Sequence, residues 1–358
     1  MTSTAPAPPG SGTWMATEIR EQPAALRRTV DTLLPQVPEV AALAARTRQV
    51  LFVARGSSDA AAHYGRYLCE VGAGRLATPA SPSVATLYRR RLDLSGVLAV
   101  ALSQSGRTAE IVETLVWARD CGARTVAVTN DAGSPLAAAA ELVLVTAAGP
   151  ERALPATKTY TTQLAALVVL ALGLGADPAL GSALRTVPAA VEAALDTAAA
   201  ATELAERLSD VDGLVVSGRG FASSTAWELS LKIRETCAID ASGLSYADLL
   251  HGPIAVVGAR TPALLVAAAD GPVLPGVLGL ADRLRAAGAP VYGIGGGPAL
   301  AAACTAALPG PDLPEALAPL ALVVPGQLTA EALSRRLGLD PDTPGGLTKV
   351  TQTDGGAG

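Results

Sequence analysis

Hydroxyl side chains are concentrated in Ser103-Gln104-Ser105-Gly106-Arg107-Thr108, between an apolar run and a helical stretch. The run at residues 97–102 predicts a strand, and residues 109–120 predict a helix. A helix N-terminus carries free N–H groups and a partial positive charge, and small hydroxyl residues add further donors. Ser and Thr are also common in ordinary helix caps. Three hydroxyls in six residues nevertheless favour a phosphate-binding turn.

Two other segments have a similar character. Arg55-Gly56-Ser57-Ser58-Asp59 follows the apolar run at residues 50–54. If the two predicted strands are neighbours, Ser57 and Ser58 face the same cleft as the first turn. Ala156-Thr157-Lys158-Thr159 precedes a helical stretch and adds a cation to its hydroxyls. A lysine there is also typical of a solvated helix start, so the spacing leaves both interpretations of Lys158 open.

Glu228, Lys232 and Glu235 fall at positions i, i+4 and i+7 of a helical pattern, on one helix face. The spacing alone is typical of an exposed stripe of ion pairs. However, apolar residues flank the stripe, and the helix follows the turn Gly218-Arg219-Gly220, which places its start at the ligand edge of a sheet. A half-buried glutamate beside a lysine could transfer protons near neutral pH.

The chain has two histidines. His251 precedes Gly252-Pro253, which predicts a loop with a restrained backbone, and it is placed like a catalytic acid or base. His63 lies among alanines in a helical pattern and is predicted to be a packed helix residue. Near the C-terminus, the segment 341–350 is irregular and holds Lys349 between apolar residues, which favours a docked tail over a disordered one.

Composition excludes several classes of protein. A net charge of −5 argues against nucleic acid, and the longest apolar run is too short to span a bilayer. Four widely separated cysteines and two histidines argue against a metal centre and favour reduced thiols in the cytoplasm. No metal or organic cofactor is expected.

The same pattern of strands occurs twice along the chain. Short apolar runs ending in small or polar residues predict parallel strands. In the first half they lie at residues 50–54, 97–102, 125–129 and 141–145, and in the second at 213–217, 263–267, 291–294 and 320–324. Similar spacings in the two halves indicate a duplicated, doubly wound α/β domain with a boundary near residues 195–210.

Together, these motifs resemble those of the sugar isomerase (SIS) domain family in a two-domain arrangement. The resemblance runs from about Glu18 to Thr353 and is nearest to stand-alone SIS-type glucosamine-6-phosphate deaminases and to the isomerase half of glucosamine-fructose-6-phosphate synthase. Besides the turns above, it rests on Glu18-Ile19-Arg20-Glu21-Gln22-Pro23, Leu231-Lys232-Ile233-Arg234-Glu235-Thr236, His251-Gly252-Pro253, Leu339-Asp340-Pro341-Asp342 and Leu347-Thr348-Lys349-Val350-Thr351.

The resemblance implies a fold of two tandem SIS domains, each a flavodoxin-like three-layer sandwich around a doubly wound parallel sheet. We expect a disordered head at 1–13, a first domain with the phosphate site at 14–200, a second domain at 201–340 and a tail entering the active site at 341–358. Residues 1–13 are rich in Thr, Ala, Pro and Gly, as disordered segments are.

The resemblance also implies roles for individual residues. Glu235 matches the residue that moves a proton between C1 and C2, and Lys232 matches a lysine near the C1 oxygen. His251 matches the ring-opening histidine, which the neighbouring subunit donates in the synthase, and Lys349 matches a Schiff-base lysine. The sugar phosphate is contacted by the residues matching Ser57, Ser58, Ser103, Gln104, Ser105 and Thr108, with Thr157 and Lys158 beside them.

The expected activity is isomerisation with deamination, converting glucosamine 6-phosphate and water to fructose 6-phosphate and ammonia. No glutaminase domain precedes the SIS region, and the second residue is Thr2 rather than the nucleophilic cysteine of the synthase. Asp248, Leu250 and Ala156 depart from the family pattern at the sugar end. Galactosamine-6-phosphate deaminase/isomerase, fructosamine-6-phosphate deglycase and a non-catalytic sugar-phosphate sensor therefore remain alternatives. A homodimer with shared sites is expected, with no nucleic acid or membrane partner.

Overall fold

The structure is a computed structural model that describes residues 12–349, and its contacts divide the chain into two compact units. The first unit comprises residues 24–150, 158–185 and 346–349 of the described chain, and the second comprises 12–23, 151–157 and 186–345. The units interleave along the chain, whereas the ranges expected from the sequence were contiguous.

Both predicted terminal segments lie partly outside the described residues. Of the expected head at 1–13, only residues 12 and 13 are described, and Thr13 is an ordered N-cap of the first helix. The expected tail at 341–358 is described as far as Lys349.

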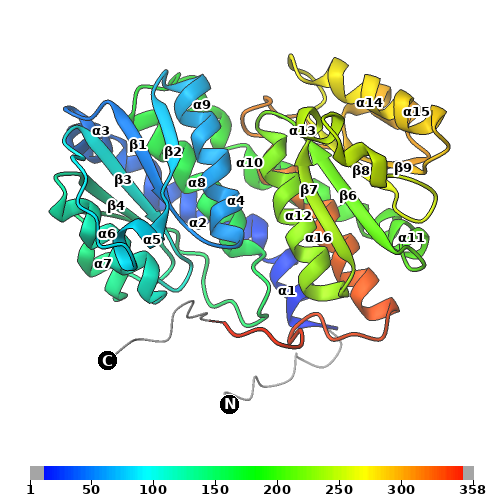
Figure 1. The fold of residues 1–358 in the computed structure, drawn as a ribbon, viewed down its shortest axis with the longest axis horizontal. Helices are drawn as coiled ribbons and strands as arrows, with labels where there is room; N and C mark the ends of the chain where they lie inside the picture. The colour runs from blue at the N-terminus through cyan, green and yellow to red at the C-terminus, as the bar shows by residue number, and fades with distance from the viewer. Residues whose placement is uncertain (1–11, 350–358) are drawn as a thin grey trace. The chain divides into compact units, whose positions relative to one another are not determined.

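A five-stranded parallel sheet forms the centre of the first unit (Figure 1). Its strand order is β2-β1-β3-β4-β5, so the sheet grows in opposite directions from β1, and the switch point lies between β1 and β3. The strands are β1 (Gln49–Val53), β2 (Leu76–Pro79), β3 (Val97–Leu102), β4 (Arg124–Thr129) and β5 (Leu142–Val145).

Helices cover both faces of this sheet. Val53, Ala99 and Ala101 pack on one face with α6 and α7, while Phe52 on the other face contacts Gly65 of α4. The result is a three-layer sandwich. The helices are α2 (Gln22–Leu33), α3 (Val37–Ala44), α4 (Ser57–Tyr67), α5 (Pro82–Thr86), α6 (Ala109–Asp120), α7 (Pro135–Ala139), α8 (Lys158–Gly173) and α9 (Ala179–Leu184).

The second unit repeats the topology, with parallel strands in the order β7-β6-β8-β9-β10. Its strands are β6 (Gly213–Gly218), β7 (Asp240–Ser245), β8 (Ala263–Ala267), β9 (Val291–Gly295) and β10 (Ala306–Leu308). Its helices are α1 (Trp14–Arg20), α10 (Val187–Ala194), α11 (Ala198–Arg207), α12 (Ala222–Cys237), α13 (Tyr246–Leu250), α14 (Leu274–Ala286), α15 (Gly297–Ala303) and α16 (Pro319–Arg336). The duplicated, doubly wound α/β fold is therefore confirmed.

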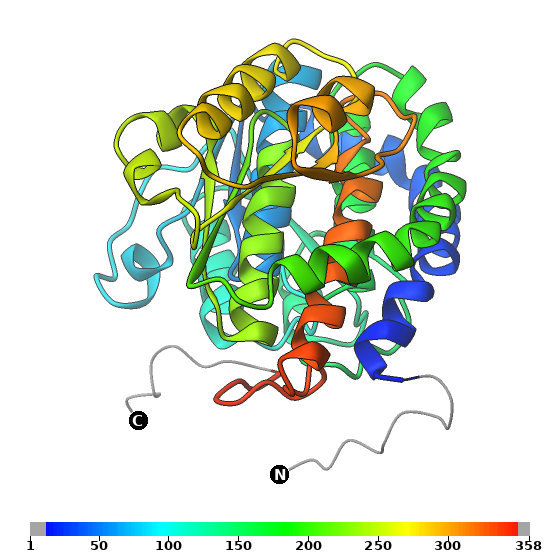
Figure 2. The ribbon, with the colours of Figure 1, turned by 90° about the vertical axis from the view of Figure 1, so that its right-hand side faces the viewer.

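One predicted strand is wrong. Residues 320–324 lie in α16, which contacts both α11 and α12 (Figure 2), and the fourth strand of the second repeat is β10 instead. Because α16 is buried along nearly its whole length, its apolar residues form a continuous run that looks like a buried strand. None of the described helices, α16 included, is long and apolar enough to cross a membrane.

Candidate active site

Two hydroxyl-bearing turns flank the switch point of the first sheet. Ser57 and Ser58 open α4 directly after β1, and the turn at residues 103–108 connects β3 to α6, with Thr108 as its N-cap. β1 pairs directly with β3, so the two turns follow neighbouring parallel strands. Ser103 is buried, and the other residues predicted to contact the phosphate on these turns are half-buried. The first unit thus presents hydroxyls and helix N-termini at the edge where such sheets bind ligands.

The turn after β3 has a fixed shape that requires glycine. Gly106 has φ of +62°, and a Cβ on it would lie 2.2 Å from Oγ of Ser134. The Gly106 N–H donates to Oγ of Ser103 at 3.1 Å, and the Arg107 N–H donates to Oγ of Ser105 at 3.2 Å. These contacts hold the Ser103 and Ser105 hydroxyls in place within the turn.

The two turns are braced from either side. Arg55 Nε and Nη2 each donate to the Glu110 carboxylate at 3.0 Å, which ties the β1–α4 turn to the first turn of α6. Since Arg55 is about half exposed, this pair adds little stability, but its bidentate geometry fixes orientation. Gln163 of α8 donates to Oγ of Ser58 at 3.0 Å. The first unit therefore positions both turns from three helices.

Thr157 and Lys158 are neighbours in sequence but belong to different compact units. Thr157 is fully buried, and its N–H and Oγ1 donate to Oε1 of Glu151 at 2.9 and 3.5 Å. Lys158 begins α8 and is 1% exposed. The interpretation of Lys158 as a solvated helix-start lysine is therefore wrong.

The acid/base stripe of α12 is buried, which contradicts its interpretation as an exposed ion-pair stripe. Glu228 and Lys232 have no exposed surface, while the Glu235 side chain is 21% exposed. Lys232 Nζ donates to the Glu235 carboxylate and lies 3.7 Å from Oε1 of Glu228. α12 thus presents one ammonium between two carboxylates, of which only Glu235 reaches solvent.

Charge balance in this cluster favours protonated Lys232. Burial lowers its pKa, but Glu228, Glu235 and Glu151 together outweigh burial, so its pKa is raised above the ordinary value. A lysine that keeps its proton can donate a hydrogen bond to a developing oxyanion, while the adjacent carboxylate accepts or returns a proton. Glu151 was not singled out from the sequence, because nothing in the pattern links it to α12.

His251 and Lys349 come from segments other than α12, which carries this cluster. His251 is the C-cap of α13 and is exposed, and its backbone N–H donates to the Asp248 carbonyl at 3.1 Å. Lys349 is the last described residue and is half-buried. His63 lies within α4, as predicted, with its ring 5.4 Å from that of Tyr67.

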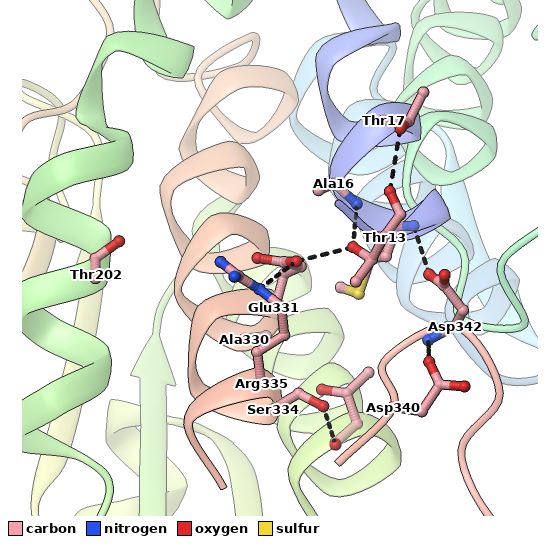
Figure 3. A network of polar contacts seen from close by, with 12 residues as sticks. Thr13, Ala16, Thr17, Thr202, Ala330, Glu331, Ser334, Arg335, Asp340 and Asp342 are labelled. Carbon is pink, nitrogen blue, oxygen red and sulfur yellow. Dashed lines mark hydrogen bonds and ion pairs between the residues drawn. The ribbon is translucent and has the colours of Figure 1, made fainter. Parts of the chain in front are cut away.

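Residues 341–345 of the C-terminal tail belong to the second unit, where Asp342 lies at the start of α1 (Figure 3), whereas residues 346–349 belong to the first unit. The Asp342 carboxylate accepts the N–H groups of Trp14 and Met15 at 2.7 Å each. Thr13 Oγ1 donates to Glu331 of α16 at 2.8 Å, so the start of α1 is held by two carboxylates. Burial raises the pKa of Asp342 even though these N–H bonds lower it.

Comparison with known proteins identifies the family. The SIS domain model matches residues 44–173. A candidate phosphosugar isomerase from Silicibacter pomeroyi DSS-3, known from its crystal structure, is 35% identical with a TM-score of 0.84, and the match covers 92% of this chain and 99% of that one. The chain belongs to the SIS-domain family.

Other members show how far the likeness extends. The isomerizing glutamine–fructose-6-phosphate aminotransferase of Methanothermobacter thermautotrophicus is 35% identical over 349 residues, which are 95% of this chain but 58% of that protein. The chain thus spans less than two thirds of this curated relative. Glucosamine-6-phosphate deaminase from Thermotoga maritima is 22% identical with a TM-score of 0.80, covering 95% of this chain and all of that one, which shows a shared fold.

Lysine usage in this SIS protein is itself informative. Of 27 basic residues, only Lys158, Lys232 and Lys349 are lysine, which leaves 24 arginines. Lys158 and Lys232 are at most 1% exposed, although lysine is almost never fully buried unless paired. Two of the three lysines are therefore buried, while arginine makes up the rest of the basic residues. This count was available from the sequence and points to the same three residues as the motifs.

Proposed function

We propose that this SIS protein is an amino-sugar-phosphate isomerase and deaminase that converts glucosamine 6-phosphate and water to fructose 6-phosphate and ammonia. The observation that supports this most is the buried Glu228–Lys232–Glu235 array. A sensor needs no buried ammonium between carboxylates, whereas a proton transfer between adjacent carbons needs an acid, a base and low solvent access.

The proposal assigns each group one task. The turns at residues 57–58 and 103–108 bind the phosphate through N–H and hydroxyl donors, which fixes C1 and C2 of the sugar. Lys232 polarises the C1 oxygen, and Glu235 carries the proton from C2 to C1. The resulting ketose imine adds water and releases ammonia, which leaves the ketose phosphate. Lys349 is the candidate for a transient imine with the open-chain ketose.

The relatives support this substrate class by their names. The curated relative is an aminotransferase acting on fructose 6-phosphate, and one structural neighbour is a glucosamine-6-phosphate deaminase. Galactosamine 6-phosphate and a fructosamine 6-phosphate remain alternative substrates. Asp248 and Leu250, in the segment before His251, differ from the residues that the family pattern has at these positions.

Ammonia release from glucosamine 6-phosphate by the purified protein is the direct test. We expect release together with stoichiometric fructose 6-phosphate, and at least a hundredfold loss in Glu235→Gln, because an amide cannot carry the proton. Thermal stabilisation by the sugar phosphate without ammonia from any of the three substrates would support the sensor instead.

We also propose a homodimer in which His251 acts in the site of the partner subunit. Leu250 and Val256, one residue before and five residues after His251, are 36% and 60% exposed, and exposed apolar side chains in one segment suit an interface. Mixing His251→Asn with Glu235→Gln after joint refolding should restore up to about a quarter of the wild-type activity, because random pairing gives half heterodimers with one intact site each. No recovery, with dimers present, would assign His251 to its own chain.

A further inference from the structure

The second unit repeats the turn that follows β1 in the first. In the shared strand order, β6 and β8 take the places of β1 and β3, so the switch point of the second sheet lies between β6 and β8. Arg219-Gly220 follows β6 as Arg55-Gly56 follows β1, and both glycines are left-handed, with φ of +61° and +59°. The two units therefore build the same turn at the same edge of their sheets.

The serines that follow this turn are used differently in the two units. Ser57 and Ser58 open α4 in the first unit and are half-buried. Ser223 and Ser224 of α12 are at most 1% exposed, and their hydroxyls donate to backbone carbonyls three residues earlier at 2.6 and 2.8 Å. The second unit thus commits this pair of hydroxyls to its own backbone.

The carboxylate of Glu315 lies against both turns at the second switch point. A Cβ at Gly220, after β6, would lie 3.5 Å from Oε1 of Glu315, and a Cβ at Gly271, after β8, would lie 2.4 Å from Oε2. Gly271 is left-handed as well, with φ of +98°. Glycines on both turns therefore make room for this carboxylate, in the way that glycine turns make room for a bound phosphate.

The segment that carries Glu315 has a counterpart in the first repeat. Residues 309–318 connect β10 to α16, as residues 146–157 connect β5 to α8. Residues 151–157 belong to the second unit, whereas residues 309–318 remain in the unit whose strands they follow. The repeat thus places its connecting segment differently, and in the second unit that segment delivers Glu315 to the switch point.

We propose that Glu315 closes a second ligand cradle of the chain, that its carboxylate occupies the position of a bound anion, and that inorganic phosphate enters once this side chain is removed. The start of α12 follows Gly220, and the free N–H groups and partial positive charge of a helix N-terminus stabilise a carboxylate as they do a phosphate. The inference does not rest on the proposed function, because phosphate binding is measured without turnover.

Thermal unfolding of the full-length protein in sodium phosphate, against sodium chloride of equal ionic strength, tests the proposal. The opened variant is Glu315→Ala with Asp270→Asn, since the carboxylate of Asp270, next to Gly271, would repel phosphate. The matched control is Glu315→Gln with Asp270→Asn, which has the same charge but keeps a side chain that fills the cradle. Crystals of both variants soaked in sodium phosphate locate the ion.

We expect about 50 mM phosphate to raise the Tm of the opened variant about 1–3 °C more than the Tm of the control or the wild type. The crystals should show an ion between Gly220 and Gly271 in the opened variant. Adding Ser105→Ala should leave the extra rise in Tm unchanged, because that serine lies on the phosphate turn of the first unit.

Three outcomes overturn the inference. One is an equal phosphate response in the opened variant and the control. Another is an extra rise in Tm that Ser105→Ala removes, which would assign the ion to the first unit. The third is an ion in the crystal without a response in solution, which would be an adventitious ion only. If the double variants do not fold, Glu315→Ala and Glu315→Gln alone make the same comparison. Absence of glucosamine 6-phosphate turnover would refute the proposed function and leave this result unaffected.

Discussion

Gly106 shows how one residue can determine the shape of a turn. Its positive φ and the proximity of Ser134 leave no room for a side chain. Gly133, three residues after Asn130 in the neighbouring loop, has no such constraint, since the nearest atom to a Cβ there is 3.4 Å away. Gly106 and Gly133 of the first unit therefore differ in whether the surrounding atoms leave room for a Cβ.

Gly106→Ala should destabilise the first unit by about 1–3 kcal/mol, because Ala must adopt a left-handed backbone and displace Ser134. It should also abolish thermal stabilisation by glucosamine 6-phosphate. Differential scanning calorimetry with and without the sugar phosphate measures both effects. Gly133→Ala, as the control, should stay within about 0.5 kcal/mol of the wild type, and equal behaviour of the two variants would refute the role of Gly106.

His63 gives the fold a dependence on pH in mild acid. Burial, assisted by Arg66, lowers the pKa of His63 to about 4. Between pH 6.5 and 4 the unfolded chain therefore binds a proton that the folded chain does not, so stability falls on acidification through this window and is fully present above it. The contribution lost at pH 5 is roughly 2 kcal/mol.

Urea unfolding of wild type and His63→Gln at pH 7 and pH 5 isolates this contribution. The variant should lose less stability between the two pH values than the wild type does, because it lacks the buried imidazole. A difference between wild type and His63→Gln that does not change with pH would show that His63 titrates normally in the fold.

At the scale of elements, α12 carries the charged cluster on one face and packs closely against α16 on another. One face carries Glu228 and Lys232, while Leu229 packs against Gly326 of α16. A Cβ at Gly326 would lie 2.4 Å from both Cδ atoms of Leu229, which is 1% exposed. The close approach of these helices therefore depends on a glycine.

Gly326→Ala should cost about 1–3 kcal/mol of stability through overpacking, and kcat should fall because α12 carries the acid/base cluster. Gly279→Ala in α14 is a matched change in the same unit, with no atom within 4 Å of its Cβ. That variant should gain roughly 0.5–1 kcal/mol from helix propensity. Chemical denaturation of both variants measures their free energies of unfolding. If Gly326→Ala is as stable as the wild type, α16 can shift away from α12.

At the scale of the whole chain, the two units share a strand order but differ in the residues that follow their strands. The turn after β8 has Asp270 where the first unit has hydroxyls, and a Cβ at the adjacent Gly271 would lie 2.4 Å from Oε2 of Glu315. Burial and Asp270 raise the pKa of Glu315. Two acidic groups at this turn disfavour a phosphate.

Isothermal titration of Glu235→Gln with glucosamine 6-phosphate should therefore give one site per chain. Ser105→Ala should weaken that site, because it removes a hydroxyl from the turn, and Asp270→Asn should leave the stoichiometry at one. Two sites per chain in Glu235→Gln would show that the second unit binds sugar phosphate as well.

The sequence by itself determined the repeated α/β pattern, the hydroxyl turns and the stripe of α12, because these depend on local periodicity and on residue types at strand ends. It could not separate strand from helix at residues 320–324, since an element buried on all sides has no polar face to reveal its period. It also missed the edge strands β2, β7 and β10, which are short or lack an apolar run.

Tertiary structure alone decided which charges are buried. Spacing allowed an exposed stripe for Lys232 and a solvated helix start for Lys158, and packing excluded both. Glu18 was assigned no role because the N–H groups that it accepts, at residues 152–153, lie far away in sequence. Contacts of this kind follow from how the chain folds back on itself, and no local pattern encodes them.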